Sequence, residues 1–238
     1  MLKERRQILI HNAVTRGLNP DVKMKDSGVE WIGMVPEGWE VKRLASFGAF
    51  SKGGGISRAE LTEAGSPAIL YGDIYTKYDI SIKDVFHKIS SETAKKAVKI
   101  TKNLLLLTGS GETIEDIGRC VAYLGERVAF AGGDVIIFEQ KGNDSLFLSY
   151  ALNTKGAKSE KARMSKGEII VHIYGSKLKE IRMPIPPLSE QTRIAAFLDR
   201  KTAQIATAIA CKQAEIEKLK EYKATLINSA VTGKIKIL

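Results

Sequence analysis

A long stretch without proline or glycine near the C-terminus constrains this chain more than any other feature. It runs from residue 190 to about residue 231, and as a single helix it would form a rod of roughly 60 Å at about 1.5 Å per residue. Ser189 is a candidate N-cap at its start, directly after three residues that stop the preceding structure, Pro184, Pro186 and Pro187. We therefore predict a helical region over 188–238, either continuous or broken near 199–202.

A narrow apolar seam follows this stretch at the alternating 4-3 spacing of a helix that pairs with another helix. Of its eight positions, Lys212 and Lys223 are charged and six are apolar. The alternative is that the seam packs on the chain's own domain, but a seam of this length extends beyond one small domain. We predict an antiparallel, coiled-coil-like arm that mediates dimerisation through the six apolar residues, Ile205, Ile209, Ile216, Leu219, Leu226 and Ala230.

The two ends of the chain resemble each other. Residues 4–15 read ERRQILIHNAVT and residues 221–232 read EYKATLINSAVT, with six identities in twelve positions at a constant offset of 217. We predict a short helix over residues 3–15, within an N-terminal region 1–18. A helix of about a dozen residues is marginal alone in water, so we expect it to pack against the C-terminal helix.

The middle of the chain has the pattern of an α+β domain. Residues 19–40 are punctuated by glycine and proline and predict a linker that leads into a domain over 41–187. Short runs rich in Val, Ile, Phe and Tyr between glycine-rich turns predict strands, the runs being ILYGDIY, NLLLLTGSGE, CVAYLG, RVAFAGGDVIIFEQ and GEIIVHIYGSKLKEIRMPIP. Two further patterns predict helices near 90–99 and over 145–164.

Composition excludes several classes of protein. No run approaches the roughly 18 apolar residues that a membrane span needs, and the N-terminus lacks the features of a signal peptide. Cys120 and Cys211 are isolated, without a CxxC motif or a neighbouring histidine. They fit a reducing cytoplasm and predict neither a disulfide nor a metal site. We expect a cytoplasmic protein without a membrane partner.

Basic residues are concentrated in one part of the chain, whose formal net charge is +10. Residues 36–151 carry 14 Lys and Arg against 15 Asp and Glu, whereas residues 152–182 carry eight against three. A solvated surface is one interpretation of such a segment. The Ser, Thr, His and Tyr residues among these cations favour double-stranded DNA as a ligand instead, because they donate to phosphates and base edges.

We predict that DNA contacts residues of 152–182, aided by loops at 51–58 and 108–113. Lys and Arg would hold phosphates, and the polar side chains would reach base edges in the major groove. The candidate DNA-binding residues are Lys52, Arg58, Ser110, Thr113, Lys158, Lys161, Arg163, Ser165, Lys166, His172, Tyr174, Ser176 and Lys177.

No catalytic or metal site is predicted. Pro20-Asp21 and Glu40-Val41-Lys42 formally spell a nuclease motif, but the Pro-Asp pair lies in the linker. The glycine loops at 51–57 and 109–118 lack the pattern of a P-loop or a dinucleotide-binding loop. The three histidines are dispersed and do not have metal-ligand spacing. A non-catalytic protein is expected.

Four segments resemble a known family. They are SGVEWIGMVPEGWEVKRL (27–44), MPIPPLSEQTRIAAFLD (183–199), LINSAVTGKI (226–235) and AVTRGLNPDVKMKDSG (13–28). Together they resemble the specificity (S) subunits of type I restriction–modification systems over nearly the whole chain. The body between 45 and 182 is the part in which such subunits diverge.

The resemblance implies a reader without a cofactor of its own. Adenine methyltransferase (M) subunits and restriction (R) subunits would be its partners and would use S-adenosylmethionine, ATP and Mg. Full-length subunits of the family hold two target-recognition domains, whereas this chain has one and begins within what resembles their central helix. It would be a half-length form or the latter half of a longer subunit, and acting alone it would be a homodimer that reads a symmetric bipartite site.

Three rival functions remain at this point. One is a recognition domain within a single-chain restriction enzyme, although the methyltransferase part is not in this sequence. The second is a cryptic DNA nuclease. The third is a structural adaptor whose helix binds partners and whose basic segment is only a solvated surface.

Overall fold

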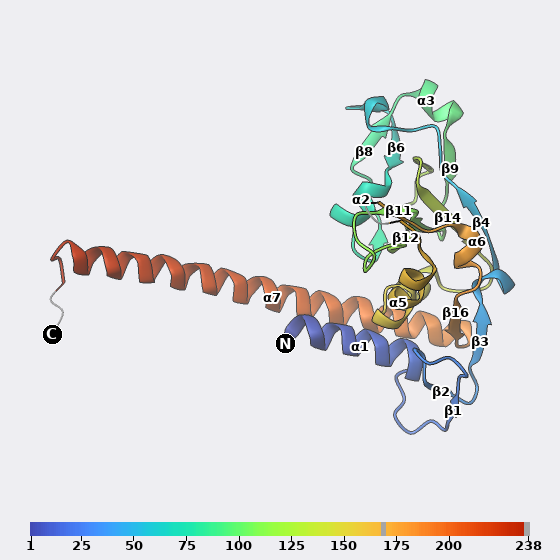
Figure 1. The fold of residues 1–238 in the computed structure, drawn as a ribbon, viewed down its shortest axis with the longest axis horizontal. Helices are drawn as coiled ribbons and strands as arrows, with labels where there is room; N and C mark the ends of the chain where they lie inside the picture. Colours follow the sequence, from blue (N-terminus) through green and yellow to red (C-terminus); the bar gives the residue numbers. More distant parts are fainter. Residues whose placement is uncertain (168–169, 236–238) are drawn as a thin grey trace.

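One helix of 44 residues, α7 (Leu188–Val231), begins inside the folded domain and extends far beyond it (Figure 1). The computed structural model describes residues 1–167 and 170–235. The described residues outside α7 form the short N-terminal helix α1 (Leu2–Arg16) and a mixed α and β domain. The predicted α+β class, with a short first helix and a long last helix, is confirmed.

The strands form two larger sheets and three short pairs. One five-stranded sheet has the order β4-β14-β10-β12-β7, and the other has the order β5-β8-β6-β13-β9; β1 pairs with β2, β3 with β16, and β11 with β15. The strands are β1 (Met24–Asp26), β2 (Met34–Pro36), β3 (Glu40–Arg43), β4 (Gly48–Lys52), β5 (Leu61–Thr62), β6 (Ser66–Ile69), β7 (Ser81–Ile82), β8 (His87–Ile89), β9 (Val98–Ile100), β10 (Leu105–Thr108), β11 (Ser110–Gly111), β12 (Cys120–Tyr123), β13 (Ala129–Ala131), β14 (Val135–Gln140), β15 (Val171–His172) and β16 (Arg182–Ile185).

Short helices connect and cover these sheets. They are the 3-10 turns Leu44–Ser46 and Arg58–Glu60 and the helices α2 (Tyr71–Thr76), α3 (Ser91–Lys96), α4 (Ser145–Leu152), α5 (Lys155–Met164) and α6 (Gly175–Leu178). Of these, α4 is central, because it contacts β12, α1 and α7. Its eight residues are nearly all buried.

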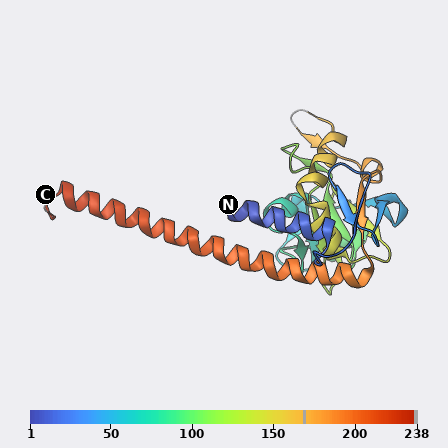
Figure 2. The same cartoon turned by 90° about the horizontal axis from the view of Figure 1, so that it is seen from below.

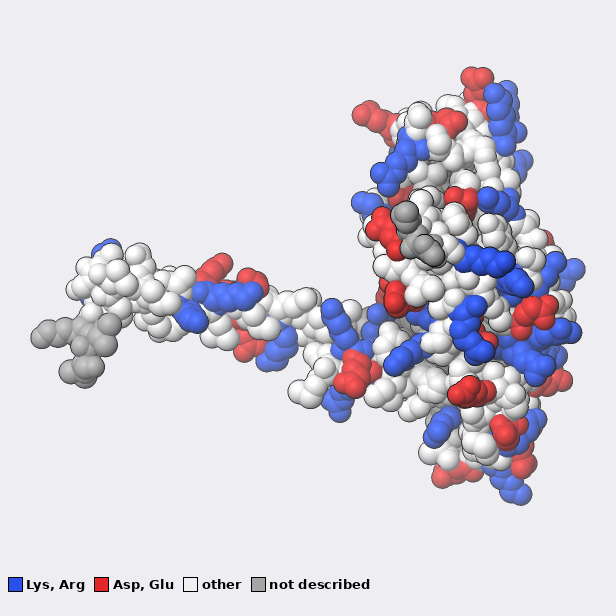
Figure 3. Space-filling model, in the orientation of Figure 1, with Lys and Arg blue, Asp and Glu red and all other residues white. Residues whose placement is uncertain are grey.

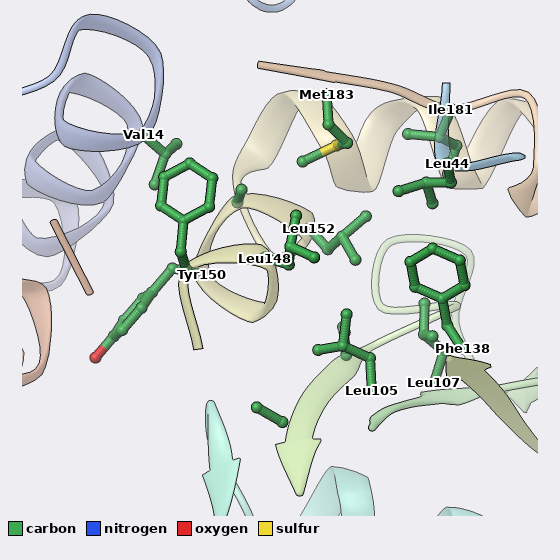
Figure 4. Packing of buried hydrophobic residues seen from close by; sticks show 14 of the residues in the cluster. Val14, Leu44, Leu105, Leu107, Phe138, Leu148, Tyr150, Leu152, Ile181 and Met183 are labelled. Carbon is green, nitrogen blue, oxygen red and sulfur yellow. The ribbon is translucent and has the colours of Figure 1, made fainter. Parts of the chain in front are cut away.

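The main core joins the first sheet to the helices through α4. Figure 4 shows Val14 of α1 pointing toward α4, while Leu148 and Leu152 of α4 lie toward Leu105 of β10. Since all of these side chains are fully buried, removing them from water stabilises the junction between the domain and the two long helices.

Only the first part of α7 is buried, and α1 lies beside it in both views (Figures 1 and 2). Ile194, Ala195 and Leu198 of α7 belong to the main core, whereas the large apolar side chains from Ile216 onward are exposed. The two helices run in opposite directions, with Gly17 at the end of α1 next to Glu190 at the start of α7.

Helix α7 decides between two predicted alternatives and differs from the prediction at one point. It is continuous through 199–202, where the Thr202 hydroxyl donates to the Leu198 carbonyl at 2.8 Å and meets the Tyr150 hydroxyl at 3.1 Å. Ser189 is not the N-cap: the helix begins at Leu188, and the turn is closed by backbone N–H groups that donate to Pro187.

Two other predicted helices are shorter than expected. The pattern over 145–164 forms two helices, because Asn153 leaves the helix and bonds Cys120 across the chain while Thr154 caps α5. The pattern at 90–99 ends at Lys96, since Val98–Ile100 pairs with β13 as an edge strand.

Two segments contain elements that the sequence did not indicate. In the run ILYGDIY, only the first residue, Ile69, belongs to β6, and Tyr71–Thr76 forms α2. Residues 19–40 carry the β1–β2 hairpin and bury Ile32, Val35 and Trp39 in the main core.

The two parts of α7 should respond differently to truncation. Leu198→Ala is expected to lower the free energy of unfolding by about 2–5 kcal/mol, because Leu198 is fully buried. Leu226→Ala, at an exposed position, should change it by about 0.5 kcal/mol or less. Urea unfolding at low protein concentration measures both, and an equal loss for the two variants would contradict this division of the helix.

Candidate nucleic-acid interface

A hollow of about 260 Å³ opens on the surface where β4, the residue before β11 and the segment from β15 to α6 meet. We call it the β4–α6 hollow. Four of the predicted DNA-binding residues line it, Lys52, His172, Tyr174 and Ser176. Phe50 and Lys179 also line it, and neither was among the predicted site residues.

The β11–β15 pair builds this hollow by joining two distant parts of the sequence. Ser110 lies opposite His172 in the pair, and the Ser110 hydroxyl and the His172 Nδ1 are 2.9 Å apart. The Ile173 N–H donates to the Gly109 carbonyl at 2.9 Å. The predicted loop at 108–113 and the predicted segment around 172 therefore form one surface.

Exposed polar side chains surround the hollow. Tyr174 is 60% exposed, and Ser176, Lys177 and Lys179 are exposed beside it. Lys52, on the opposite side, forms a 3.0 Å ion pair with Asp134. These groups offer hydroxyl and ammonium donors to a ligand that approaches from solvent.

Phe50 and Lys179 could have been found from different signals. Lys179 belongs to the basic segment 152–182, so the charge pattern already contained it. Phe50 lies on β4 and stacks on Phe138, with ring centroids 4.4 Å apart. No local sequence signal distinguishes Phe50 from a core residue.

The position of Lys161 corrects the prediction that it holds a phosphate. Its side chain is fully buried, and its ammonium donates to the Gly118 carbonyl. Burial lowers the pKa of Lys161 to about 8, because a low-dielectric surrounding disfavours the charged form. The α5 helix turns this lysine inward, so it is not available to a ligand at the surface.

Two other cations of α5 are engaged in ion pairs. Lys158 lies 2.6 Å from Asp116, and Arg163 lies 2.9 Å from Glu160. The Lys158 ammonium bonds Asp116 and lowers the pKa of that carboxyl. Exposed pairs of this kind are weak, so a phosphate could compete for either cation.

The remaining predicted residues are distributed around the hollow or away from it. Lys166 is exposed and pairs by its backbone with His172, and the half-buried Ser165 hydroxyl donates to the Ala162 carbonyl at 2.7 Å. Thr113 is exposed in the loop after β11. Arg58 lies in the 3-10 turn before β5 and does not line the hollow. Strand β5 belongs to the other five-stranded sheet.

Charge on the surface is mixed rather than uniformly basic. In the face that Figure 3 shows, Lys and Arg are spread over the domain with Asp and Glu between them. A ligand with many phosphates would therefore meet local groups of cations and not a continuous basic face.

The described residues hold no group of three or more His, Cys, Asp or Glu that could bind a metal ion. Within the same part of the chain, no helix is long and apolar enough to cross a membrane.

Residues 36–218 match the family model for the type I restriction modification DNA specificity domain. Among curated relatives, the MjaVIII specificity subunit of Methanocaldococcus jannaschii is 29% identical over 171 residues, which are 69% of this chain and 36% of that protein. The EcoKI specificity subunit of Escherichia coli is 23% identical over 209 residues, or 85% of this chain and 44% of that protein.

Solved structures share the fold. A chain from a structure concerned with complex assembly and conformational transition of the type I R-M system has a TM-score of 0.69 at 17% identity, over 96% of this chain and 51% of that chain. The HsdS subunit of Thermoanaerobacter tengcongensis has a TM-score of 0.60 at 17% identity, over 98% of this chain and 51% of that chain. This chain thus spans about half, or less, of the proteins it matches.

The buried Lys161 should make stability depend on pH. Below about pH 8 its ammonium is charged in both the folded and the unfolded chain, and the folded state carries the cost of burying it. Between pH 8 and 10.5 only the unfolded chain remains protonated there, so stability rises with pH. The free energy of unfolding of the wild type minus that of Lys161→Met should increase by up to about 3 kcal/mol from pH 7 to 10.5.

Denaturant unfolding at a series of pH values measures this difference. Lys155→Met removes an exposed ammonium of the same helix and serves as the control for lost charge. A difference between wild type and Lys161→Met that stays constant over this range would contradict the assignment.

Proposed function

The chain belongs to the type I restriction modification DNA specificity domain family, and from this premise we propose that it recognises a DNA sequence for such a system without itself modifying or cutting DNA. The observation that carries the proposal is the β4–α6 hollow, where Lys52 of β4 lines the same surface as His172, Tyr174 and Ser176 from β15 and the segment that follows it. Loops held by a rigid scaffold commonly carry such contacts.

Two kinds of contact are expected at this surface. Lys166, Lys177 and Lys179 would bind phosphates and fix the position of the domain on the duplex. Tyr174, Ser176 and His172 would reach base edges in the major groove, where each base pair offers a distinct pattern of donors and acceptors. Ser110 is buried and would act by orienting the His172 ring, to which it is hydrogen-bonded.

The partners follow from the same premise. We propose that adenine methyltransferase and restriction subunits assemble with the chain and that S-adenosylmethionine, ATP and Mg are used by those subunits. The chain would pair with a second copy through α7, so that two recognition domains read the two halves of a bipartite site. The exposed seam of α7 supports this pairing, because large apolar side chains rarely remain uncovered in a row.

Removal of cations at the hollow should weaken DNA binding and its dependence on salt. The double variant Lys177→Ala/Lys179→Ala is expected to bind duplex DNA more weakly, and the slope of log K against log salt should become shallower by about 2, because each phosphate contact contributes roughly 0.9. Fluorescence anisotropy over a salt series, without Mg²⁺, measures both quantities.

The matched control is Lys218→Ala/Lys220→Ala, which removes the same charge from the exposed arm. It should keep the slope of the wild type. Equal slopes for all three proteins would show that the hollow does not bind phosphates. Duplex that is cut when Mg²⁺ is added to the wild type would favour the nuclease alternative.

Charge on the seam of α7 should prevent self-association. Leu219→Asp or Leu226→Asp places a carboxylate where an apolar contact with a partner helix is expected, and a buried unpaired charge is strongly unfavourable. Light scattering should then report a monomer at concentrations where the wild type is a dimer. A variant that remains dimeric would exclude pairing through this seam.

A further inference from the structure

The face that α1 buries is repeated at the end of α7. The identity between the two segments extends to Leu2 and Lys3, so that eight of the 14 positions from Leu2 to Thr15 match residues 219–232 at the same offset of 217. The buried or half-buried positions of α1 that match are Leu2, Leu9, Ile10, Ala13, Val14 and Thr15. The repeat therefore preserves six of the eight inward positions of α1, and Arg6 and His11 are the two that differ.

Outward positions of α1 are mostly not repeated. Arg5, Gln7, Ile8 and Asn12 are exposed, and each is replaced by a different residue in the second segment. Of the six exposed positions, only Lys3 and Glu4 are repeated, so the identities are concentrated on the inward face. The pattern indicates that both segments are shaped for the same kind of surface.

The last turns have the same local structure in both segments. The Thr15 hydroxyl donates to the carbonyl of His11 at 2.7 Å, and the Thr232 hydroxyl donates to the carbonyl of Asn228 at 2.7 Å. Both segments are helical up to this point. They can therefore present the same side chains in the same arrangement.

Their surroundings are opposite. Ile10 and Val14 of α1 are 4% and 0% exposed, whereas their counterparts Ile227 and Val231 are 54% and 82% exposed. The end of α7 projects away from the domain (Figure 2), and within residues 1–167 and 170–235 these side chains remain exposed. A face that is buried when it occurs in α1 is thus uncovered when it occurs in α7.

One charged position also has a partner in α1 and, among the described residues, lacks one in α7. Arg6 of α1 forms an ion pair with Asp79 of the domain, and its counterpart in α7 is Lys223. Lys223 interrupts the apolar seam, which is unfavourable for a simple coiled coil. A lysine at position 223 is explained if its side chain takes the place of Arg6, opposite Asp79.

We propose that the last three turns of α7 dock onto the first turns of α7 in a second copy of this chain, in the seat that α1 occupies in a single copy, and that α1 leaves this seat when the pair forms. The seat is the surface of α7, α4 and β2 that α1 contacts, and Ile10, Ala13 and Val14 lie in the same core cluster. The inference rests on the self-association proposed above and specifies its geometry. It makes α1 an internal competitor of dimerisation.

The exchange costs little free energy because each buried side chain that leaves is replaced by an identical one. The contacts of Ile10, Ala13 and Val14 are lost, and those of Ile227, Ala230 and Val231 of the partner subunit replace them. Exchange of an equivalent element between protomers is a low-cost route to a dimer. The middle of each α7, including the exposed Ile216, gains a partner that a single copy does not offer.

The observed packing also fixes the register. Gly17 lies next to Glu190 in a single copy. In the repeat, the position equivalent to 17 is residue 234. When the end of α7 takes the place of α1, residue 234 of one copy therefore faces residue 190 of the other. The pairing is antiparallel, obeys two-fold symmetry and is centred near residue 212. If residues 2–16 of α1 stayed in the seat, the partner helix would pair only with α7 beyond them, and the centre would move to about residue 218 at 1.5 Å per residue.

Matched substitutions in the two segments test the exchange. Ile10→Ala should loosen α1 and tighten self-association by about tenfold or more, whereas Ile227→Ala should weaken self-association by about tenfold or more, in line with the effect of truncating a buried isoleucine. Arg6→Ala and Lys223→Ala should act in the same two directions without removing a core side chain. Ile8→Ala and Thr225→Ala, on the outward face, are the controls and should leave the dissociation constant unchanged.

Sedimentation equilibrium measures these constants, with thermal unfolding as the check that each variant is folded. Opposite shifts for the two members of a pair support the exchange. If Ile227→Ala weakens association while Ile10→Ala and Arg6→Ala leave it unchanged, dimerisation stands and the exchange with α1 is wrong. If neither the wild type nor any variant associates, the proposed dimer is wrong. The proposed DNA binding by a single domain does not depend on that result.

Spin labels give the register independently. Cys211 is exposed and Cys120 is buried, so a thiol label attaches to Cys211 in the wild type, and Ala224→Cys in a Cys211→Ser background places a second label. The exchange predicts backbone separations of about 10 Å at 211 and about 36 Å at 224. Pairing with α1 in place predicts about 20 Å at both positions, and a parallel pair predicts about 10 Å at both; either result overturns the proposal.

Discussion

The burial of the first turns of α7 against α1 and α4 is the interaction on which the rest of the structure depends. Leu198 and Ile194 lie in the same core as Val14 of α1 and Leu148 of α4. Polar bonds fix the ends of this contact, since the Trp39 indole donates to Glu190 at 3.0 Å and the Tyr150 and Thr202 hydroxyls meet at 3.1 Å. The helix is therefore rigidly attached at one end, and its free end can carry a function that the domain does not cover.

The candidate reading surface depends on a second long-range contact. The β11–β15 pair joins the loop after β10 to the segment after α5, and the Ser110–His172 hydrogen bond connects the two. Because a glycine-rich loop and a basic segment are brought together on one scaffold, the surface can vary in sequence while the core keeps its shape. This division is suited to a protein whose domain must read a particular DNA sequence.

The internal repeat gives the two helices a common property. The same apolar face is satisfied inside one copy at α1 and remains exposed at the end of α7. In the proposed exchange, the seat is buried either by α1 of the same copy or by the end of α7 of a second copy. The balance between them would set both the concentration at which dimers form and the separation of two recognition domains.

The sequence by itself determined the α+β class, the long C-terminal helix, the short N-terminal helix and the similarity between the ends, because these depend on periodicity, proline and glycine placement and identity along the chain. It also indicated residues 152–182 as a DNA-binding region, which stays a prediction. Only the tertiary structure decided which residues are available there: Lys161 turns inward to Gly118, and Asn153 ends α4 by bonding Cys120. Both outcomes depend on partners more than 30 residues away, and no local pattern encodes such contacts.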